Sequence, residues 1–315
     1  MADNSFAAFW DQVGLSTAQF SEDLAAQIPK LRQTFMRAAL AIETDLPEMA
    51  DVRDILVEGG DGLIQARVYT PLAAGVAPGP GIVYFHGGGF VLGDVESFDH
   101  VCRRLAAGSR CRILSVGYRR APEYKFPKPM EDAIAAFDWA VREYKAWGVD
   151  PDRLAVAGDS AGGNLAIAVT RKALERQTTT PQFQLLIYPL TQFVDLRDKG
   201  LRLKEGPFFS PALFEFFQKS YLPEGHDPMD PWVSPLFLNS FEGLPPAHIV
   251  TAGWDPLHDE GEAYAAKLRA SGVEATVRDY ANQPHGFFNT TPVSIAAREA
   301  VDDAGRVVGE ALGAI

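Results

Sequence analysis

A serine stands between two glycines in the segment Gly158-Asp159-Ser160-Ala161-Gly162, after the apolar run RLAVAGD and before the helical pattern AGGNLAIAVT. A Gly-x-Ser-x-Gly segment between a strand and a helix is typical of a sharp, strained turn that exposes the serine hydroxyl above a sheet. Small residues on both sides are needed because the turn is sharp. The flanking strand and helix make the signal far more specific than the five residues alone. We therefore predict that Ser160 is a nucleophile for acyl transfer.

A serine nucleophile needs a base that an acid orients, and the chain has six histidines. His285 lies in the loop NQPHGFF after the last predicted strand, where Gly286 gives it freedom to turn inward. We therefore predict that His285 is the base. We expect structural roles for the other five histidines: His86 bracing a loop, His100 and His226 in polar surroundings, His248 within a strand and His258 capping a helix at the surface.

The acid should come from the end of a strand between the serine and the histidine. Asp255 directly follows the apolar run AHIVTAGW, whereas Asp259 and Glu260 fall where a helix begins and interact favourably with its dipole. Asp255 is therefore the better candidate, and it gives the chain order Ser, Asp, His expected for this architecture.

A run of glycines, Gly87, Gly88 and Gly89, follows the buried strand GIVYF. Glycine reaches positive φ without steric cost, so the run is consistent with a flexible turn. It is equally consistent with a loop whose bare backbone N–H groups approach an anion. The run alone does not decide between these alternatives.

The spacing of apolar residues along the sequence predicts the secondary structure that positions these residues. Alternation in 52–59 and 62–70 around Gly59-Gly60-Asp61-Gly62 indicates a β-hairpin. Apolar runs then alternate with helical patterns, which predicts an α/β fold with a mostly parallel central sheet flanked by helices. In such folds reactive groups gather beyond the carboxyl ends of the strands. The predicted strands are 81–85, 111–118, 153–159, 184–190, 247–253 and a less buried one at 273–280.

Two segments lie outside this alternation. Residues 1–50 have helical spacing, and residues 191–236 contain two helical pieces and no strand. We predict that both form a helical cap above the sheet. The catalytic domain then consists of residues 51–190 and 237–315.

Composition excludes several classes of partner. The net charge of −12 and the pI near 5.0 oppose binding to nucleic acid or to an anionic membrane surface. The sequence shows neither a secretory signal nor a long apolar span, so we expect a cytoplasmic protein that does not bind membranes. Cys102 and Cys111 are then expected to be reduced, buried thiols, and neither has metal-site spacing.

Five motifs in order along the chain resemble the hormone-sensitive-lipase-like branch, bacterial family IV, of the α/β-hydrolase esterases. They are HGGGF at 86–90, YRRAPE at 118–123, GDSAGGN at 158–164, DPLHDEG at 255–261 and HGF at 285–287. The resemblance spans about residues 80–290. It implies an α/β-hydrolase fold with Ser160, Asp255 and His285 as the catalytic triad.

The resemblance also gives the glycine run a role. It implies that the N–H groups of Gly88, Gly89 and Ala161 form an oxyanion hole. Physical reasoning agrees, since side chains would keep a carbonyl oxygen from these donors and a helix N-terminus at Ala161 favours negative charge. We further expect Gly87 to let the loop turn, and His86 to brace the loop.

The resemblance implies that the cap closes over an acyl pocket. Candidate lining residues are Phe208, Phe209, Phe214, Phe216 and Phe217, although core packing is the more common role for any one of them. In the YRRAPE motif we expect arginine and glutamate to pair locally, with structural roles for Tyr118 and Glu123.

The predicted function is a serine carboxylesterase that hydrolyses short- to medium-chain esters without metal or organic cofactor. Its expected partner is a small-molecule ester, and the resemblance adds the expectation of a homodimer. An amidase or small-peptide hydrolase on the same triad is the alternative enzyme. A non-catalytic small-molecule receptor is less favoured because such relatives have lost the histidine that is present here as His285.

Overall fold

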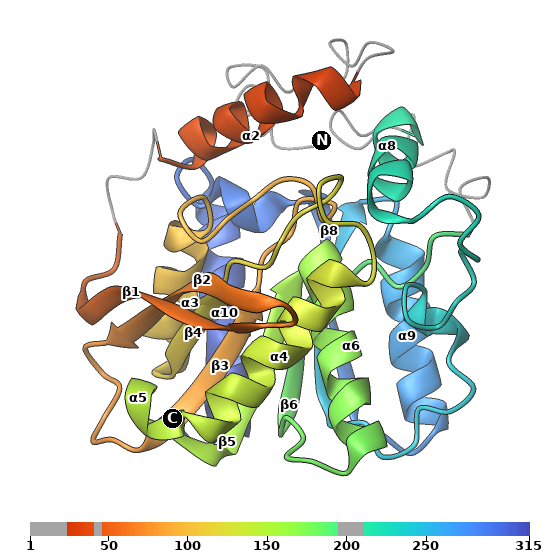
Figure 1. Cartoon of the computed structure of the whole chain (residues 1–315). Coiled ribbons are helices and arrows are strands. Elements are labelled where there is room, and N and C mark those ends of the chain that lie inside the picture. Colours follow the sequence, from red (N-terminus) through yellow and green to blue (C-terminus); the bar gives the residue numbers. More distant parts are fainter. Residues whose placement is uncertain (1–23, 41–45, 195–210) are drawn as a thin grey trace.

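The computed structural model describes residues 24–40, 46–194 and 211–315, and in that part of the chain eight strands form one sheet (Figure 1). In chain order the strands are β1 (Met49–Gly59), β2 (Gly62–Pro71), β3 (Gly79–Phe85), β4 (Arg112–Val116), β5 (Val149–Asp159), β6 (Phe183–Ile187), β7 (Ala247–Trp254) and β8 (Ala275–Pro284). The helices are α2 (Leu24–Leu40), α3 (Asp99–Ser109), α4 (Lys128–Arg142), α5 (Tyr144–Trp147), α6 (Ala161–Arg176), α8 (Pro211–Tyr221), α9 (His258–Ala270) and α10 (Ile295–Ala311), with 3-10 turns η2 (Pro235–Phe237) and η3 (Phe287–Thr290).

The sheet has the order β1-β2-β4-β3-β5-β6-β7-β8. β2 is antiparallel to both β1 and β4, and every other neighbouring pair is parallel. The predicted hairpin and all the predicted strands are therefore confirmed. β3, β4 and β6 are buried throughout, which explains why their sequences are continuous apolar runs. The edge strand β8 is exposed or half-buried over most of its length.

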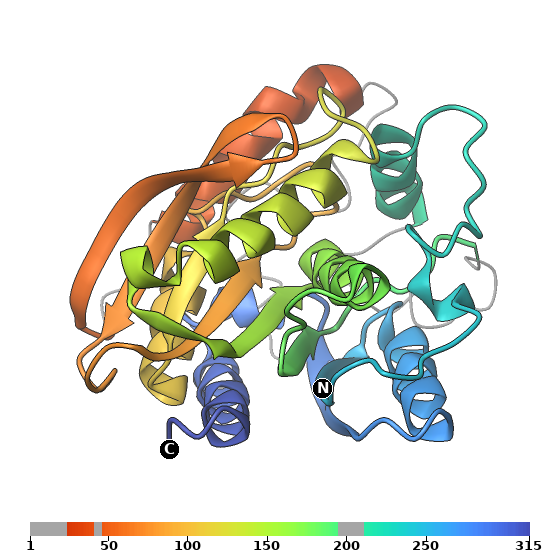
Figure 2. The same cartoon turned by 60° about the horizontal axis from the view of Figure 1, so that its bottom comes forward.

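The helices cover both faces of the sheet and one of its ends. α3 and α10 pack together on one face, and α4 and α6 lie on the opposite face (Figures 1 and 2). α2 and α8 lie over the end at which β3 and β5 finish (Figure 1). The loops that carry chemistry in parallel sheets are thus covered by these two helices.

The helix α2 packs one face against the fold. Ile28, Leu31 and Phe35 are buried at helical spacing, and the Phe35 ring lies 6.0 Å from that of Phe98. Helical structure was predicted over residues 1–50, but β1 already begins at Met49, and residues 1–23 and 41–45 lie outside the described part.

The helix α8 lies in the predicted insertion and also buries one face, formed by Leu213, Phe214, Phe217 and Tyr221. The Tyr221 ring stacks on Phe90 with centroids 3.7 Å apart. Burial of one such side chain stabilises the fold by about 1.5–3 kcal/mol. Residues 195–210 lie outside the described part, and the rest of the insertion contains no strand.

Both cysteines are buried and free, as predicted. Burial raises the pKa of Cys111 to about 11, and it also raises the pKa of Cys102. Neither thiol contributes to the chemistry described below.

Candidate active site

Ser160 occupies the turn between β5 and α6. Its backbone angles, φ +54° and ψ −117°, are strained for a residue with a side chain. The turn is held by two backbone bonds, in which Ser160 N–H donates to Ile187 O (2.8 Å) and Leu190 N–H donates to Ser160 O (3.0 Å). The neighbouring strand β6 and the residues after it thus fix the position of the serine.

The glycines on either side of Ser160 are required by close packing. A Cβ at Gly158 would overlap the carbonyl oxygen of Gly162, and a Cβ at Gly162 would overlap that of Phe85 at the end of β3. Both glycines have ordinary negative φ. The small residues therefore let α6 start directly against two strands.

Three side chains form one chain of hydrogen bonds at this end of the sheet. His285 Nε2 lies 2.9 Å from Ser160 Oγ, and its Nδ1 lies 2.8 Å from Asp255 Oδ2. A carboxylate only accepts, so Nδ1–H donates to Asp255 and Nε2 is left to accept from the serine hydroxyl. This arrangement can take the serine proton during nucleophilic attack.

Each partner is placed by the end of a strand. Asp255 follows β7 directly, is fully buried, and also accepts the Leu257 N–H through Oδ1 (2.7 Å). His285 follows β8, and Gly286 with φ +78° turns the chain behind it. Asp255 and His285 lie 95 and 125 positions after Ser160 in the sequence. The three residues nevertheless meet at the carboxyl end of the strands.

The other histidines make structural contacts, but the surface position expected for His258 was wrong, because its side chain is buried. His100 is buried as well, and it has the polar surroundings that were expected, with Asp99 and Arg104 nearby. Burial lowers the pKa of His100 to about 4. His258 begins α9 as predicted, and its ring contacts two exposed carboxylates, those of Asp259 (2.8 Å) and Asp279 (3.3 Å). Periodicity alone does not show how deeply the first turn of a helix is covered.

The glycine run forms a tight turn. Val91 N–H and Leu92 N–H both donate to Gly88 O (3.0 and 2.8 Å), with Gly88 at φ +106° and Gly89 at φ +61°. Such angles favour glycine. The described residues supply no acceptor for the N–H groups of Gly88, Gly89 and Ala161.

Gly87 serves a different purpose from the one expected. Its φ is not positive, so the expectation that it lets the loop turn was wrong. A Cβ at Gly87 would overlap the carboxylate of Asp159, while its N–H donates to Asp159 Oδ1 (2.8 Å). Glycine is therefore needed here for close approach to a buried carboxyl group.

Asp159 supports the glycine loop from below. It accepts the Tyr84 hydroxyl (2.7 Å) as well as Gly87 N–H, and burial raises its pKa to about 6. No sequence pattern marks Tyr84 or Asp159 for this role, although Asp159 lies inside the serine motif.

His86 braces the same loop, as expected. Its Nδ1–H donates to Gly87 O (2.8 Å), and its ring stacks on Tyr118, 4.2 Å between centroids. Tyr118 in turn donates its hydroxyl to His86 O (2.7 Å). Burial lowers the pKa of His86 to about 4, so the ring stays neutral near pH 7.

A small apolar cavity of about 20 Å³ opens at Ser160. Its other lining residues are Gly89, Phe90, Ala161, Leu190, Phe193, Phe214, Phe217 and Leu257. Of the predicted lining residues, Phe214 and Phe217 are among them. Phe216 instead packs on Phe217, with centroids 5.6 Å apart, and Phe208 and Phe209 lie outside the described residues.

Four of these lining residues were missed: Phe90, Leu190, Phe193 and Leu257. Phe90 directly follows the glycine run and is the one that could have been found from the sequence. The other three read as ordinary apolar positions because their approach to Ser160 depends on long-range packing.

The YRRAPE segment does not pair locally as expected. Glu123 binds Arg32 of α2 (2.8 Å), and Arg119 binds Asp132 of α4 (2.6 Å). Glu123 has the expected structural role, but its ion pair connects the segment to α2, which is distant in the sequence.

No described helix has the length and apolar character needed to cross a membrane. Within residues 24–40, 46–194 and 211–315, no three histidine, cysteine, aspartate or glutamate side chains converge as metal ligands.

Comparisons with known proteins agree with this geometry. Residues 82–289 match the model of a family described as having the alpha/beta hydrolase fold. The carboxylic ester hydrolase LipN of Mycobacterium tuberculosis is 42% identical over 247 residues, which cover 76% of this chain and 65% of that protein. An ethyl acetate hydrolase of Pseudomonas putida is 32% identical over 293 residues, 92% of each chain.

A solved structure extends the comparison to the whole fold. An ester hydrolase from the metagenome of Lake Arreo, determined with a bipyridine phosphonate derivative, superposes with a TM-score of 0.92 at 37% identity and covers 99% of this chain and 100% of that one. The chain therefore belongs to the α/β-hydrolase fold family, within its hormone-sensitive-lipase-like branch.

Proposed function

We propose that this protein is a serine carboxylesterase that hydrolyses short- to medium-chain carboxylic esters through an acyl-enzyme intermediate. The observation that carries the proposal is the hydrogen-bonded chain from Ser160 through His285 to Asp255 at the mouth of an apolar cavity. The names of two relatives, a carboxylic ester hydrolase and an ethyl acetate hydrolase, support the substrate class.

In the proposed acylation step, His285 Nε2 takes the proton of Ser160 as Oγ bonds to the ester carbonyl carbon. Asp255 holds the Nδ1–H tautomer and stabilises the imidazolium that forms. The carbonyl oxygen becomes an oxyanion that accepts hydrogen bonds from Gly88, Gly89 and Ala161 N–H. His285 then gives its proton to the alkoxide, the C–O bond breaks and the alcohol leaves.

Deacylation repeats these roles with water. His285 takes a proton from water as its oxygen attacks the acyl carbon, and it returns the proton to Ser160 Oγ when the ester bond to the enzyme breaks. The products are the carboxylic acid and free enzyme. Every proton passes through His285, so no further group is needed for this sequence of steps.

We propose that the segment before β1, residues 1–48, and residues 191–236 form the cap over this site, and that residues 49–190 and 237–315 form the catalytic domain. The position of α2 and α8 over the end of the sheet at which β3 and β5 finish supports this division (Figure 1). The cytoplasmic location and the homodimer remain proposals from the sequence.

Hydrolysis of p-nitrophenyl esters from acetate to laurate tests the function, with Ser160→Ala as the inactive control. We expect the highest kcat/KM among the short and medium chains. A matched anilide tests the amidase alternative. Faster cleavage of the anilide than of the aryl ester would replace the proposed function by that alternative.

A further inference from the structure

Arg32 of α2 reaches across to the loops beneath the helix. Its Nε–H donates to Val91 O (2.8 Å), and its Nη2–H donates to Ala121 O (2.7 Å). Glu123 binds the same guanidinium through both carboxylate oxygens at 2.8 Å. The Arg32 side chain is only 19% exposed, so these bonds are partly shielded from solvent.

Both carbonyls lead directly to the turn that carries the glycine amides. Val91, whose carbonyl Arg32 binds, donates its own N–H to Gly88 O (3.0 Å). Ala121, the second acceptor, donates its N–H to Phe90 O (2.9 Å). Arg32 therefore holds the turn at 88–92 through two short and independent connections.

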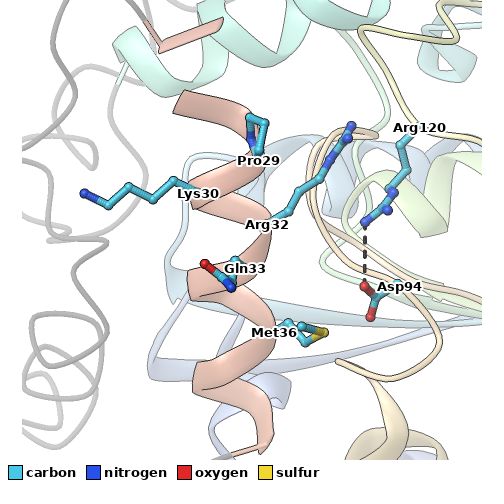
Figure 3. Close-up of a pocket in the computed structure, with 7 residues that line it drawn as sticks. All are labelled: Pro29, Lys30, Arg32, Gln33, Met36, Asp94 and Arg120. Carbon is cyan, nitrogen blue, oxygen red and sulfur yellow. Dashed lines mark ion pairs between the residues drawn. The ribbon is translucent and has the colours of Figure 1, made fainter. Parts of the chain in front are cut away.

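Arg120 holds the next part of the same loop. It donates to Gly93 O and lies 3.8 Å from Asp94 Oδ2. Figure 3 shows Arg32 extending from α2 toward the loop of Arg120, whereas Lys30 extends to the other side of the helix. A groove of about 540 Å³ runs beside these side chains. The two arginines thus bind the outer side of the loop whose inner side faces Ser160.

We propose that Arg32 is a positioning residue for the oxyanion donors, acting through Val91 and Ala121 on the amides of Gly88 and Gly89. This inference rests on the proposed function of the site. It goes beyond an anchoring role for α2, because an anchor would affect stability and substrate entry but leave transition-state stabilisation unchanged. A guanidinium is needed, since a lysine ammonium cannot donate to two carbonyls and a bidentate carboxylate in one plane.

The test compares Arg32→Lys with Arg37→Ala, an exposed arginine on the same helix. The substrate is p-nitrophenyl acetate, which has the shortest acyl chain of the ester series. Displacing the donors by a fraction of an ångström should lower kcat about 10- to 100-fold in Arg32→Lys with little change in KM. Arg37→Ala should keep the wild-type values.

A second readout separates positioning from anchoring. A phenylboronic acid bonds to the serine oxygen and places a negatively charged oxygen in the oxyanion hole, so its Ki should rise in Arg32→Lys by about the factor lost in kcat. Thermal unfolding measures any anchoring role separately. An unchanged kcat and an unchanged Ki in a folded Arg32→Lys variant would overturn the inference.

If Arg32→Lys does not fold, Glu123→Gln replaces it. Glu123 is 53% exposed, and its amide variant leaves both backbone carbonyls to Arg32 while weakening the hold on the guanidinium. We expect a smaller fall in kcat with a parallel rise in Ki, and no change in either would again contradict the inference. A wild-type protein that hydrolyses none of the esters would instead refute the proposed function itself.

Discussion

The loops at the carboxyl ends of the strands and the helices above them place their side chains by different means. In the loops, Ser160, His285 and Asp255 are joined by hydrogen bonds of 2.8–2.9 Å. In α8, Phe214 and Phe217 reach the same cavity by packing of rings. Hydrogen bonds fix direction, whereas packing mainly fixes volume. We therefore expect the loops to determine the rate of the chemical step and the helices to determine the choice of acyl chain.

The largest effect should come from the loops. His285→Ala removes the proton carrier, and where the triad acts as a unit kcat should fall by roughly 10⁶. Ester hydrolysis by purified protein measures it, and circular dichroism checks that the fold persists. His226→Ala is the matched control, since His226 contacts Asp230 (3.1 Å) and lines no part of the cavity at Ser160. A near-normal kcat in His285→Ala would place the base elsewhere.

The next largest effect should come from the contact between the glycine loop and α8. A Cβ at Gly89 would overlap the ring of Phe217, and Gly89 has φ +61°. Gly89→Ala should therefore lower kcat about 100-fold by moving an oxyanion donor. It should also lower stability by about 1 kcal/mol through backbone strain.

A double-mutant cycle sharpens this prediction. In the Phe217→Ala background the ring is gone, so Gly89→Ala should cost less in kcat than it does in the wild type. Independent, additive effects of the two changes would show that the contact between Gly89 and Phe217 does not influence the rate.

The carboxyl group beneath the glycine loop should contribute a pH dependence of stability. The pKa of Asp159 rises from 3.8 to about 6 on folding, so the native state holds a proton that the unfolded state releases. The protonated Asp159 therefore contributes about 3 kcal/mol to the free energy of unfolding below pH 4. This contribution is lost as the pH rises through 6. Asp159→Asn stays neutral and keeps an acceptor for Tyr84 and Gly87.

Urea unfolding of both proteins at several pH values measures the difference. Between pH 4 and 7, the stability of Asp159→Asn relative to the wild type should rise by about 3 kcal/mol. A difference that does not change with pH would show that Asp159 is charged in the native state throughout this range.

The smallest effect should come from the helix. Phe217→Ala enlarges the cavity next to Ser160, so the ratio of kcat/KM for a longer ester to that for acetate should rise about tenfold. Phe216→Ala is the control, because Phe216 packs on Phe217 outside the cavity. An unchanged ratio in Phe217→Ala would mean that α8 does not determine the choice of acyl chain.

The difference between the loops at the strand ends and the helices above them also explains which features could be predicted from the sequence. Ser160, Asp255 and His285 were chosen because each follows a strand, and parallel strands bring such positions together. The strands themselves were recognisable because burial on both faces makes them continuously apolar. Local sequence therefore determines the framework and most of the loop geometry.

Contacts that depend on distant packing could not be predicted. Arg32 and Glu123 are 91 residues apart, and nothing near either residue indicates the other. The sequence around Gly87 suggests only a turn. The reason for the glycine is the carboxylate of Asp159, which comes from another strand and lies close to Gly87 only in the folded chain. Phe193 and Leu190 approach Ser160 through the long-range arrangement of the chain after β6.

The buried cysteines make this chain suitable for site-specific labelling. Cys102 and Cys111 are the only cysteines of the sequence, both are inaccessible, and burial keeps both thiols protonated near neutral pH. A cysteine introduced at an exposed position of α8, such as Lys219, would then be the single reactive thiol. A fluorophore or spin label attached there would test whether α8 moves during turnover, without any change to the native sequence elsewhere.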